Sequence, residues 1–416
     1  MTAPAMGPAD HAGVRRNNLS LVLRLLGTEG TRSRAAVAAE TGLNKATVSS
    51  LVNDLIDRGL VRELGFDGRR RLGRPATLIE LDGRQVASIG LEINVDLVTV
   101  VGMDLGGRIL FERGRAIDVA RRPLIRTLAT VTAMASEAYE EVRQISTTVA
   151  GITVAVPGLV DATTRTVAIA PNLGLHDLEL GERLAEALGG DLRVTIDNDA
   201  NLAALAEYRI GQCAGTQNLI YITGQTGVGG GLIVDGRLAR GASGFSGEIG
   251  HMRVGPADRI CGCGRRGCWE ALVGLQQLMR DAVPDLAARL GAQKDKGPEA
   301  KVAAIVARAE ARDPVALKAL DRHAGWLGTG LSILVNIFNP QVVILGGFFR
   351  EIGPWVVPTA ERIMHEQTMA PDAGGCRIVT SNLGYSAAAM GAAIHAAERV
   401  FDDPTTVPIA DATPLH

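Results

Sequence analysis

Apolar residues recur at helical spacing in two places within the first 60 positions of the chain. The first series consists of Leu19, Val22, Leu23 and Leu26. It predicts a helix that ends near Gly27 and Gly30. The second series consists of Val48, Leu51, Val52, Leu55 and Ile56, and it predicts a helix that ends at Gly59.

Polar residues mark a short helix between these two. Ser33 is a favourable N-cap for a helix that runs to Glu40 and ends at residues 41–42, and Asn44 caps the helix that follows. Residues 60–64 and 76–81 then have the composition of strands, and a glycine-containing loop over residues 65–75 joins them. This order of elements is typical of a winged helix-turn-helix that binds DNA.

The polar residues of this module are its candidate DNA contacts. Short polar or basic side chains occupy the caps and the open face of the third helix: Ser33, Asn44, Lys45, Thr47, Ser49, Ser50 and Asn53. The loop adds Arg69, Arg70, Arg71 and Arg74. We expect these arginines to lie along a phosphate backbone or in a minor groove. The alternative interpretation of the arginines is a solvated hairpin tip.

Beyond residue 86, strands and helices alternate. The first elements are three strands over 86–92, 97–104 and 109–117, a helix over 124–142 and a buried strand over 149–156. Further strands are predicted over 194–197, 218–223, 230–234 and 342–345, with helices between them. The pattern predicts an α/β body with two lobes. A repeated order of three strands, helix and strand occurs in the actin-like, ribonuclease H-like fold, although periodicity does not distinguish it from other α/β folds.

The chain of 416 residues therefore divides into four segments. We expect a disordered tail over residues 1–14, the winged helix-turn-helix over 15–83, the two-lobed body over 86–400 and a C-terminal tail over 401–416. Residues 1–85 carry a net charge of +4 and the rest −6, which restricts a polyanionic partner to the small module. Because the sequence has neither a long apolar stretch nor an apolar signal core, we expect a cytoplasmic protein without membrane contact.

A cysteine and histidine motif lies within residues 251–268. Its residues are His251, Cys261, Cys263 and Cys268. Three thiolates and one imidazole form the ligand set of a closed tetrahedral zinc site, and the surrounding glycines allow a short loop to wrap the ion. We predict a structural zinc ion here, and we expect Cys213 and Cys376 to take no part in it.

This motif belongs to a longer signature. Residues 247–251 and 261–270 resemble the signature of the ROK family, which comprises repressors, open reading frames and sugar kinases. The resemblance extends over nearly the whole chain and includes residues 156–161, 170–173, 197–201, 226–231 and 345–347. A winged helix-turn-helix before such a body is similar to the xylose-repressor and N-acetylglucosamine-repressor branch of the family. The resemblance implies an actin-like body that binds a sugar between its lobes.

The resemblance also implies which residues bind the sugar. They are Gly158, Asn172, Asn198, Asp199, Glu248, His251 and Glu270. His251 would serve both sites, with one ring nitrogen on zinc and the other directed to a sugar hydroxyl, so that zinc organises the sugar site without catalysis. Taken singly, Asn198 and Asp199 are also typical of a helix cap, and Glu270 of a helix start.

The same resemblance bears on catalysis. In the kinases of the family, the counterpart of Asp199 is the general base for phosphoryl transfer from ATP. Those kinases have the sequence Asp-x-Gly-Gly-Thr after the first strand, whereas this chain has Glu92 to Asp96 without glycine. The glycines at 227–231 remain, but they can equally form a tight strand connection. We therefore predict that the chain is not an enzyme and that Asp199 is a vestigial base.

Together these features predict a sugar-responsive DNA-binding regulator, a repressor of carbohydrate uptake or catabolism genes. The expected partners are double-stranded operator DNA, a monosaccharide or sugar derivative, and further copies of the chain in a homodimer or homotetramer. Two alternatives remain open: an ATP-dependent sugar kinase, and a regulator controlled by a partner protein. The sequence does not identify the sugar or the operator.

Overall fold

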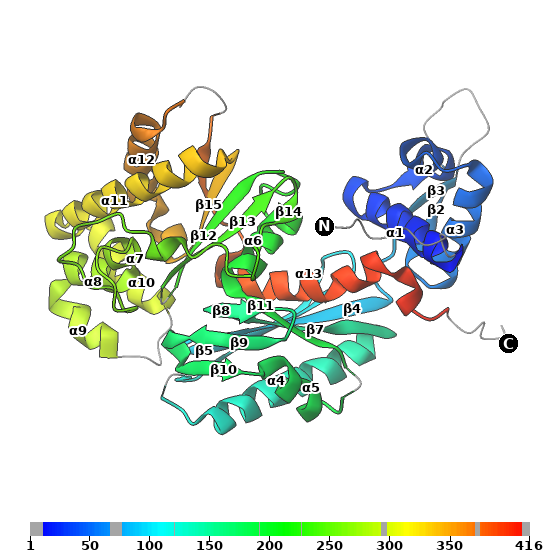
Figure 1. Ribbon diagram of the computed structural model, residues 1–416, viewed down its shortest axis with the longest axis horizontal. Coiled ribbons are helices and arrows are strands. Elements are labelled where there is room, and N and C mark those ends of the chain that lie inside the picture. Colours follow the sequence, from blue (N-terminus) through cyan, green and yellow to red (C-terminus); the bar gives the residue numbers. More distant parts are fainter. Residues whose placement is uncertain are drawn as a thin grey trace, which may run out of the picture.

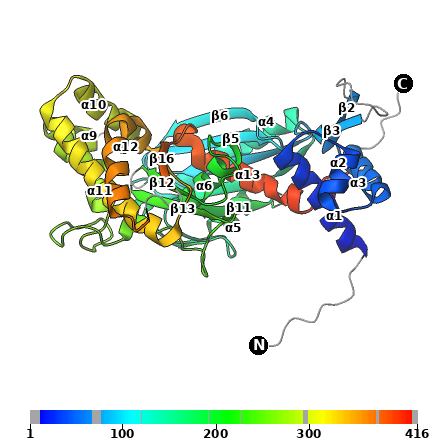
Figure 2. The ribbon, with the colours of Figure 1, turned by 90° about the horizontal axis from the view of Figure 1, so that it is seen from above.

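The computed structural model describes residues 11–66, 77–119, 121–190, 192–225, 227–292, 298–370 and 375–409. A small N-terminal module lies at one end of the long axis, and the two-lobed body occupies the rest (Figure 1). Seen from above, the module and helices α10 (Pro298–Glu310), α11 (Pro314–Phe338) and α12 (Phe348–Gln367) lie at opposite ends (Figure 2). The predicted order of a winged helix followed by an α/β body is confirmed.

The module contains three helices and a three-stranded sheet. Its helices are α1 (His11–Glu29), α2 (Arg34–Thr41) and α3 (Lys45–Asp57), and its strands are β1 (Arg32–Ser33), β2 (Val61–Phe66) and β3 (Thr77–Leu81), in the order β1-β3-β2. The predicted caps are present, because the Ser33 hydroxyl accepts a hydrogen bond from the backbone N–H of Ala36 and Asn44 Oδ1 accepts one from Thr47. Gly42 ends α2 with φ of +73°.

Both predicted tails include residues that the structure places in helices or turns. Helix α1 begins at His11, so residues 11–14 are helical and the predicted boundary at residue 14 is wrong. At the other end, α13 (Ala387–Asp402) and the 3-10 turn η4 (Pro404–Thr406) continue into the predicted tail, which is wrong for residues 401–409. The reason is apolar burial: Val407 is buried and Phe401 packs against the same apolar cluster as α1.

The first lobe is built on a five-stranded sheet in the order β11-β7-β4-β5-β6. Its strands are β4 (Val86–Ile93), β5 (Leu97–Asp104), β6 (Ile109–Ala116), β7 (Thr148–Val156) and β11 (Val194–Asn198). Strands β4, β7 and β11 are parallel, whereas β5 and β6 run antiparallel to their neighbours. Helix α4 (Leu124–Ile145) packs against one face and α13 against the other. Helix α5 (Leu180–Ala187) packs against β11.

The second lobe repeats this plan in the order β14-β13-β12-β15-β16. Its strands are β12 (Leu219–Gly224), β13 (Val228–Val234), β14 (Arg237–Leu238), β15 (Val342–Gly347) and β16 (Arg377–Thr380). Helices α7 (Glu270–Val273), α8 (Leu275–Ala282) and α9 (Pro284–Ala292) join α10, α11 and α12 on one side of the sheet (Figure 1). The largest apolar cluster of the described residues lies between this sheet and these helices.

Two helices lie between the sheets. Helix α6 (Asp199–Ile210) packs against β12 and β13, and α13 packs against α6 and against β4, β5 and β7. The contacts are so close that glycine is required: a Cβ on Gly391 of α13 would lie 1.7 Å from the carbonyl oxygen of Leu202 in α6. Helices α6 and α13 therefore form the shared layer that connects the two lobes.

One sheet was not predicted. Strands β8 (Leu159–Asp161), β9 (Thr166–Ala170) and β10 (Leu175–Leu178) form a three-stranded sheet that projects from the first lobe. These strands have three to five residues, which is too short for a clear alternating pattern. The 3-10 turn η1 (Pro171–Leu173) between β9 and β10 carries Asn172. No helix in the described part of the chain is long and apolar enough to cross a membrane.

Candidate functional site

The predicted DNA-contacting residues on helix α3 lie along its open side. Asn44, Lys45, Ser50 and Asn53 are exposed, while Thr47 and Ser49 are half-buried. Their apolar neighbours on α3 are buried against α1 and α2. Ser33 and Asn44 use their side-chain oxygens as helix caps, so their first role is structural. The four loop arginines Arg69, Arg70, Arg71 and Arg74 lie outside the described residues.

Helix α3 is tied to helix α1 by charge. Arg15 of α1 donates to Asp54 of α3 at 2.7 Å, and Arg58 donates to the same carboxylate at 2.7 Å. Burial raises the pKa of Asp54, but the two guanidinium groups lower it by more, so that the pKa lies below its ordinary value. The position of α3 therefore depends on α1, which contacts the body.

The four predicted metal ligands lie together. One ligand atom from each of His251, Cys261, Cys263 and Cys268 lies within 4.8 Å of all the others. The Cys263 and Cys268 sulfurs are 3.8 Å apart, and His251 Nδ1 is 3.9 Å from the sulfur of Cys261. Tetrahedral zinc with Zn–S bonds of about 2.3 Å requires sulfur separations of about 3.8 Å. The donor set and its spacing therefore fit zinc.

Local turns produce this geometry. His251 lies in the 3-10 turn η2 (Ile249–His251), and the three cysteines lie on a loop closed by isolated bridges between Arg253 and Cys268 and between Ile260 and Arg266. Gly264 has φ of +81° and Gly267 has φ of +75°, a region that residues with a side chain rarely adopt. The glycines let the loop turn tightly enough to bring the sulfurs together.

Asn198 and Asp199 lie where strand β11 meets helix α6. Asn198 caps α6 by accepting a hydrogen bond from the N–H of Asn201 at 3.1 Å, and its Nδ2 donates to the carbonyl of Gly158 at 3.0 Å. Gly158 has φ of +114°, and a Cβ there would lie 2.4 Å from the carbonyl oxygen of Ile169. The cap interpretation is thus correct for Asn198, and the same contacts join it to Gly158.

Asp199 is a buried carboxylate at the start of helix α6. It is 8% exposed, and its Oδ1 accepts a hydrogen bond from the N–H of Ala200 at 2.9 Å. Burial raises the pKa of Asp199 to about 6, and the neighbouring carboxylate of Glu248 adds to the shift. A hydrogen-bond donor placed next to Asp199 would stabilise its charged form.

Glu248, His251 and Glu270 lie on the second lobe around the cysteine loop. Because Nδ1 of His251 faces Cys261, its Nε2 is free to face Glu248, whose Oε2 is 3.8 Å away. Glu270 Oε1 accepts a hydrogen bond from the Cys261 thiol at 3.3 Å, and its Oε2 accepts one from the N–H of Val228 at 2.9 Å. The histidine and cysteine cluster and the acidic side chains therefore form one continuous group.

Asn172 approaches this group from the first lobe. A Cβ on Gly227 would lie 2.5 Å from Glu270 Oε2 and 3.8 Å from Asn172 Nδ2, so the two side chains flank the same glycine. Gly227 thus serves close packing at the site. Each of the seven predicted sugar-binding residues has another member of the set, or a shared neighbour, beside it.

Sequence reasoning missed several polar contacts between the lobes. Gln225 of the second lobe donates to Glu92 Oε1 at 3.0 Å and hydrogen-bonds to Asn94, and Lys301 of α10 pairs with Asp96 at 3.3 Å. Gln225 lies two residues before the first glycine of the loop and offered a weak signal, whereas nothing in the sequence connects Lys301 with Asp96.

A further missed contact joins the end of strand β11 to a loop of the second lobe. Arg240 pairs with Asp197 through two hydrogen bonds of 2.6 and 3.0 Å. Asp197 is 2% exposed and precedes Asn198 and Asp199 directly. Arg240 of the second lobe therefore fixes the end of strand β11 through this ion pair.

Comparison with known proteins places this arrangement in a family. Residues 89–399 match the model described as ROK family, and residues 20–70 match the MarR family. The xylose repressor of Bacillus subtilis (strain 168) is 31% identical over 386 residues, which cover 93% of this chain and 96% of that protein. The glucokinase of Streptomyces coelicolor is 32% identical over 323 residues, covering 74% of this chain and 98% of that protein.

Solved structures agree with the sequence comparisons. A crystal structure of a ROK family transcriptional regulator, a homolog of the E. coli MLC protein, superposes with a TM-score of 0.76 at 26% identity. The match covers 94% of this chain and 97% of that one, so it includes the N-terminal module. Most of the chain matches the family model, and its body carries the histidine, cysteine and carboxylate groups described above. The chain therefore belongs to the ROK family.

Proposed function

We propose that this protein is a DNA-binding transcriptional regulator, a repressor of carbohydrate uptake or catabolism genes, whose body binds a monosaccharide or sugar derivative. The observation that carries the proposal is the combination, in one chain, of a winged helix module with a body in which Asp199, Glu248, His251 and Glu270 lie near one another. The Bacillus subtilis relative, which matches both parts, is named a xylose repressor.

Hydroxyl recognition supports a sugar as the ligand. A sugar ring presents several hydroxyl groups, and carboxylates are the strongest side-chain acceptors for them. The cleft offers the carboxylates of Asp199, Glu248 and Glu270 together with the free Nε2 of His251. Because these groups come from both lobes, sugar would favour one closure angle, and its effect on DNA equals its differential affinity for the two states.

Zinc is the proposed cofactor, with a structural role. His251, Cys261, Cys263 and Cys268 would hold the ion, and a site with four protein ligands leaves no open position for catalysis. Holding Nδ1 of His251 on the metal would fix the tautomer and direct the Nε2 N–H to the sugar. The metal would thus set the position of one sugar-binding group.

We propose operator DNA as the macromolecular partner, bound by the modules of a homodimer or homotetramer in the cytoplasm. Helix α3 would enter the major groove through Lys45, Thr47, Ser49, Ser50 and Asn53, with Ser33 and Asn44 near the backbone. A simple dimer would contact half-sites separated by about one helical turn, roughly 34–36 Å.

The functional test uses the full chain and a labelled operator fragment from the promoter next to its gene. Fluorescence anisotropy would measure operator affinity with and without a panel of pentoses, hexoses and N-acetylated hexoses. One sugar is expected to change the affinity by about 5- to 150-fold, the usual range of allosteric coupling. If no sugar changes the affinity or the melting temperature of the zinc-loaded protein, a partner-controlled regulator is the better explanation.

The wing arginines provide a separate prediction. Replacing Arg69 and Arg74 by Ala should weaken operator binding and reduce the slope of log affinity against log salt by about 0.9 for each phosphate that is no longer neutralised. The matched control replaces the exposed body residue Arg237, which should leave the slope unchanged. Equal slopes for the wing variant and the native protein would remove the wing from the DNA interface.

A sugar kinase is the second candidate, because the Streptomyces coelicolor glucokinase matches 74% of the chain. The residues of the first loop argue against it. Asp96 is 6% exposed and is neutralised by Lys301, and Glu92 is 3% exposed and hydrogen-bonded across to the second lobe. Protein groups therefore bridge the two lobes at this loop, and they bring carboxylates where a phosphate loop needs glycine and backbone N–H groups.

We therefore expect no multiple turnover when the zinc-loaded protein is incubated with ATP, magnesium and the same sugar panel. Coupled measurement of ADP release checks this, with the Streptomyces coelicolor glucokinase assayed in parallel as the active control. Sustained ADP release that depends on one sugar would establish the kinase candidate instead.

A further inference from the structure

The DNA-binding module is packed against the body through a specific junction. Helix α1 lies along the C-terminal end of α13, and one apolar cluster contains Leu19 and Leu23 of α1 together with Ala397 and Val400 of α13. A Cβ on Gly27 of α1 would lie only 3.0 Å from the Phe401 ring. The orientation of the module therefore depends on where the end of α13 lies.

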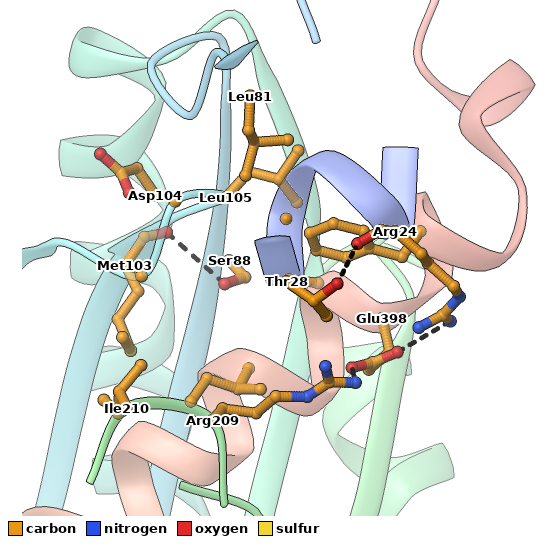
Figure 3. A pocket seen from close by; sticks show the side chains of 16 residues that line it. Arg24, Thr28, Leu81, Ser88, Met103, Asp104, Leu105, Arg209, Ile210 and Glu398 are labelled. Carbon is orange, nitrogen blue, oxygen red and sulfur yellow. Dashed lines mark hydrogen bonds and ion pairs between the residues drawn. The ribbon is translucent and has the colours of Figure 1, made fainter. Parts of the chain in front are cut away.

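A shared carboxylate crosses this junction. Glu398 of α13 accepts a hydrogen bond from Arg24 of α1 at 2.9 Å through Oε2, and its Oε1 accepts one from Arg209 of α6 (Figure 3). Arg24 also pairs with Asp402 at 2.6 Å. The Glu398 side chain is 21% exposed and that of Arg209 is 28% exposed, so solvent screens the bridge only in part. Glu398 thus joins the module to helix α6.

Helix α6 connects that bridge to the cleft. Its first residue is Asp199, and Arg209 lies in its last turn. A helix of 12 residues is about 18 Å long and moves as a rigid unit over this distance. Residues 199–207 are all buried, and the close contact of Gly391 with Leu202 holds α6 on α13. A displacement of Asp199 by sugar would therefore also displace Arg209 at the other end of the helix.

The junction also has room for a second arrangement. A pocket of about 110 Å³ lies beside the bridge, and its wall includes Arg24, Arg209 and Glu398 together with apolar side chains of β3, β5 and α13 (Figure 3). The ε N–H of Arg209 is buried without a hydrogen-bond partner among the described residues. Buried donors are normally satisfied. Because this free volume borders Arg209, the guanidinium group has space to turn into the pocket.

We propose that Glu398 is the positioning residue through which the sugar cleft sets the orientation of the DNA-binding module. In one state Glu398 holds Arg209 and Arg24 together, and in the other the Arg209 side chain turns away from Glu398 and releases the end of α13. This inference rests on the proposed function, because it names the route by which sugar acts on the operator.

The test measures operator affinity with and without the active sugar, and the quotient of the two values is the operator ratio. This ratio is compared between native protein and the variants Glu398→Gln and Arg209→Gln. Glutamine keeps the size of Glu398 and one acceptor but removes the charge. Sugar affinity, measured by calorimetry, should stay within about twofold of native, whereas the operator ratio should fall to within about twofold of one. The matched control is Glu141→Gln, which removes the Arg113–Glu141 pair of 2.6 Å within the first lobe and should leave the ratio unchanged.

Two further measurements separate coupling from a general loss of structure. The double variant should have the same operator ratio as each single variant, because the two substitutions interrupt the same pathway. In native protein, sugar should change amide hydrogen exchange in α1 and at the end of α13, and this change should vanish in Glu398→Gln. If Glu398→Gln does not fold, Arg24→Gln and Arg209→Gln each break one half of the bridge and give the same readout.

The inference is overturned if Glu398→Gln or Arg209→Gln retains the native operator ratio while sugar affinity is unchanged. Failure of the proposed function looks different, because in that case the native protein itself shows no dependence of operator affinity on sugar. The first result would leave the sugar-responsive regulator in place and remove only the route through Glu398.

Discussion

Replacement of Asp199 by Asn is expected to weaken sugar binding by roughly 10- to 100-fold while making the sugar-free protein more stable. The first effect follows because a hydrogen bond to a buried charged group contributes roughly 1.5–3 kcal/mol. The second follows because the carboxylate is buried and its pKa is raised to about 6. Calorimetry with the active sugar and urea unfolding at pH 7.5 measure the two effects.

The direction of the stability effect can be derived from linkage. A carboxyl whose folded-state pKa lies above its unfolded value holds its proton more tightly in the folded state, so stability falls as pH rises between the two values. For Asp199 this window runs from about 4 to about 6. Above it, the ionised group costs roughly 3 kcal/mol. A neutral amide at this position does not ionise, so the Asp199→Asn variant would not incur this cost.

Glu92 adds a second group of the same kind. Burial and the charge of Asp199 raise its pKa to about 7, despite the hydrogen bonds from Gln225 and Asn94. Sugar-free protein should therefore lose stability as pH rises from about 4 to about 7, and Glu92→Gln should flatten the upper part of that slope. The control Asp235→Asn alters an exposed carboxylate and should change neither stability nor sugar affinity.

The Asp199 prediction has its own contradicting outcome. If the Asp199→Asn variant binds the sugar with native affinity, Asp199 is not part of the sugar site.

Replacement of Cys263 by Ser is expected to reduce zinc content and sugar response together. Loss of one thiolate leaves three ligands of a closed tetrahedral site, and even outer-shell changes at such sites lower metal affinity by roughly 10- to 100-fold. Without the metal, Nδ1 of His251 and the loop that carries the cysteines are no longer held, so Nε2 loses its direction toward Glu248.

Zinc content by metal analysis and sugar affinity by calorimetry check this expectation on the same preparation. The control is Cys213→Ser, a buried cysteine outside the cluster, which should keep its full zinc content and sugar affinity. A zinc-free Cys263→Ser protein that still binds sugar with native affinity would show that the metal does not organise the cleft.

The sequence was sufficient to predict a feature where the residues that form this feature are close together in the chain. The caps Ser33 and Asn44 act on N–H groups three residues away, and the four candidate metal ligands lie within 18 consecutive residues. The strand predicted over residues 97–104 has the bounds of β5 because it is long and apolar. In each case the interaction is set by local backbone geometry, which composition and spacing report directly.

The tails and the small sheet show where local signals end. Residues 401–409 are polar enough to suggest a tail, yet Val407 is buried against the module and Arg58 donates to the carbonyl groups of Thr405 and Val407. These contacts join segments almost 350 residues apart. Strands β8 and β10 have three and four residues, so pairing with β9 and not propensity makes them strands.

By itself, the sequence determined the order of the domains, the helix caps and the cluster of candidate metal ligands, and its resemblance to a family supplied the candidate sugar contacts. Only the tertiary structure decided how the parts are connected: Asp96 with Lys301 and Asn94 with Gln225 between the lobes, and Arg24 with Glu398 at the junction. The physical reason is that an ion pair or hydrogen bond needs its partners within about 3 to 4 Å. No pattern along the chain specifies which of many charged residues the fold will bring to that distance.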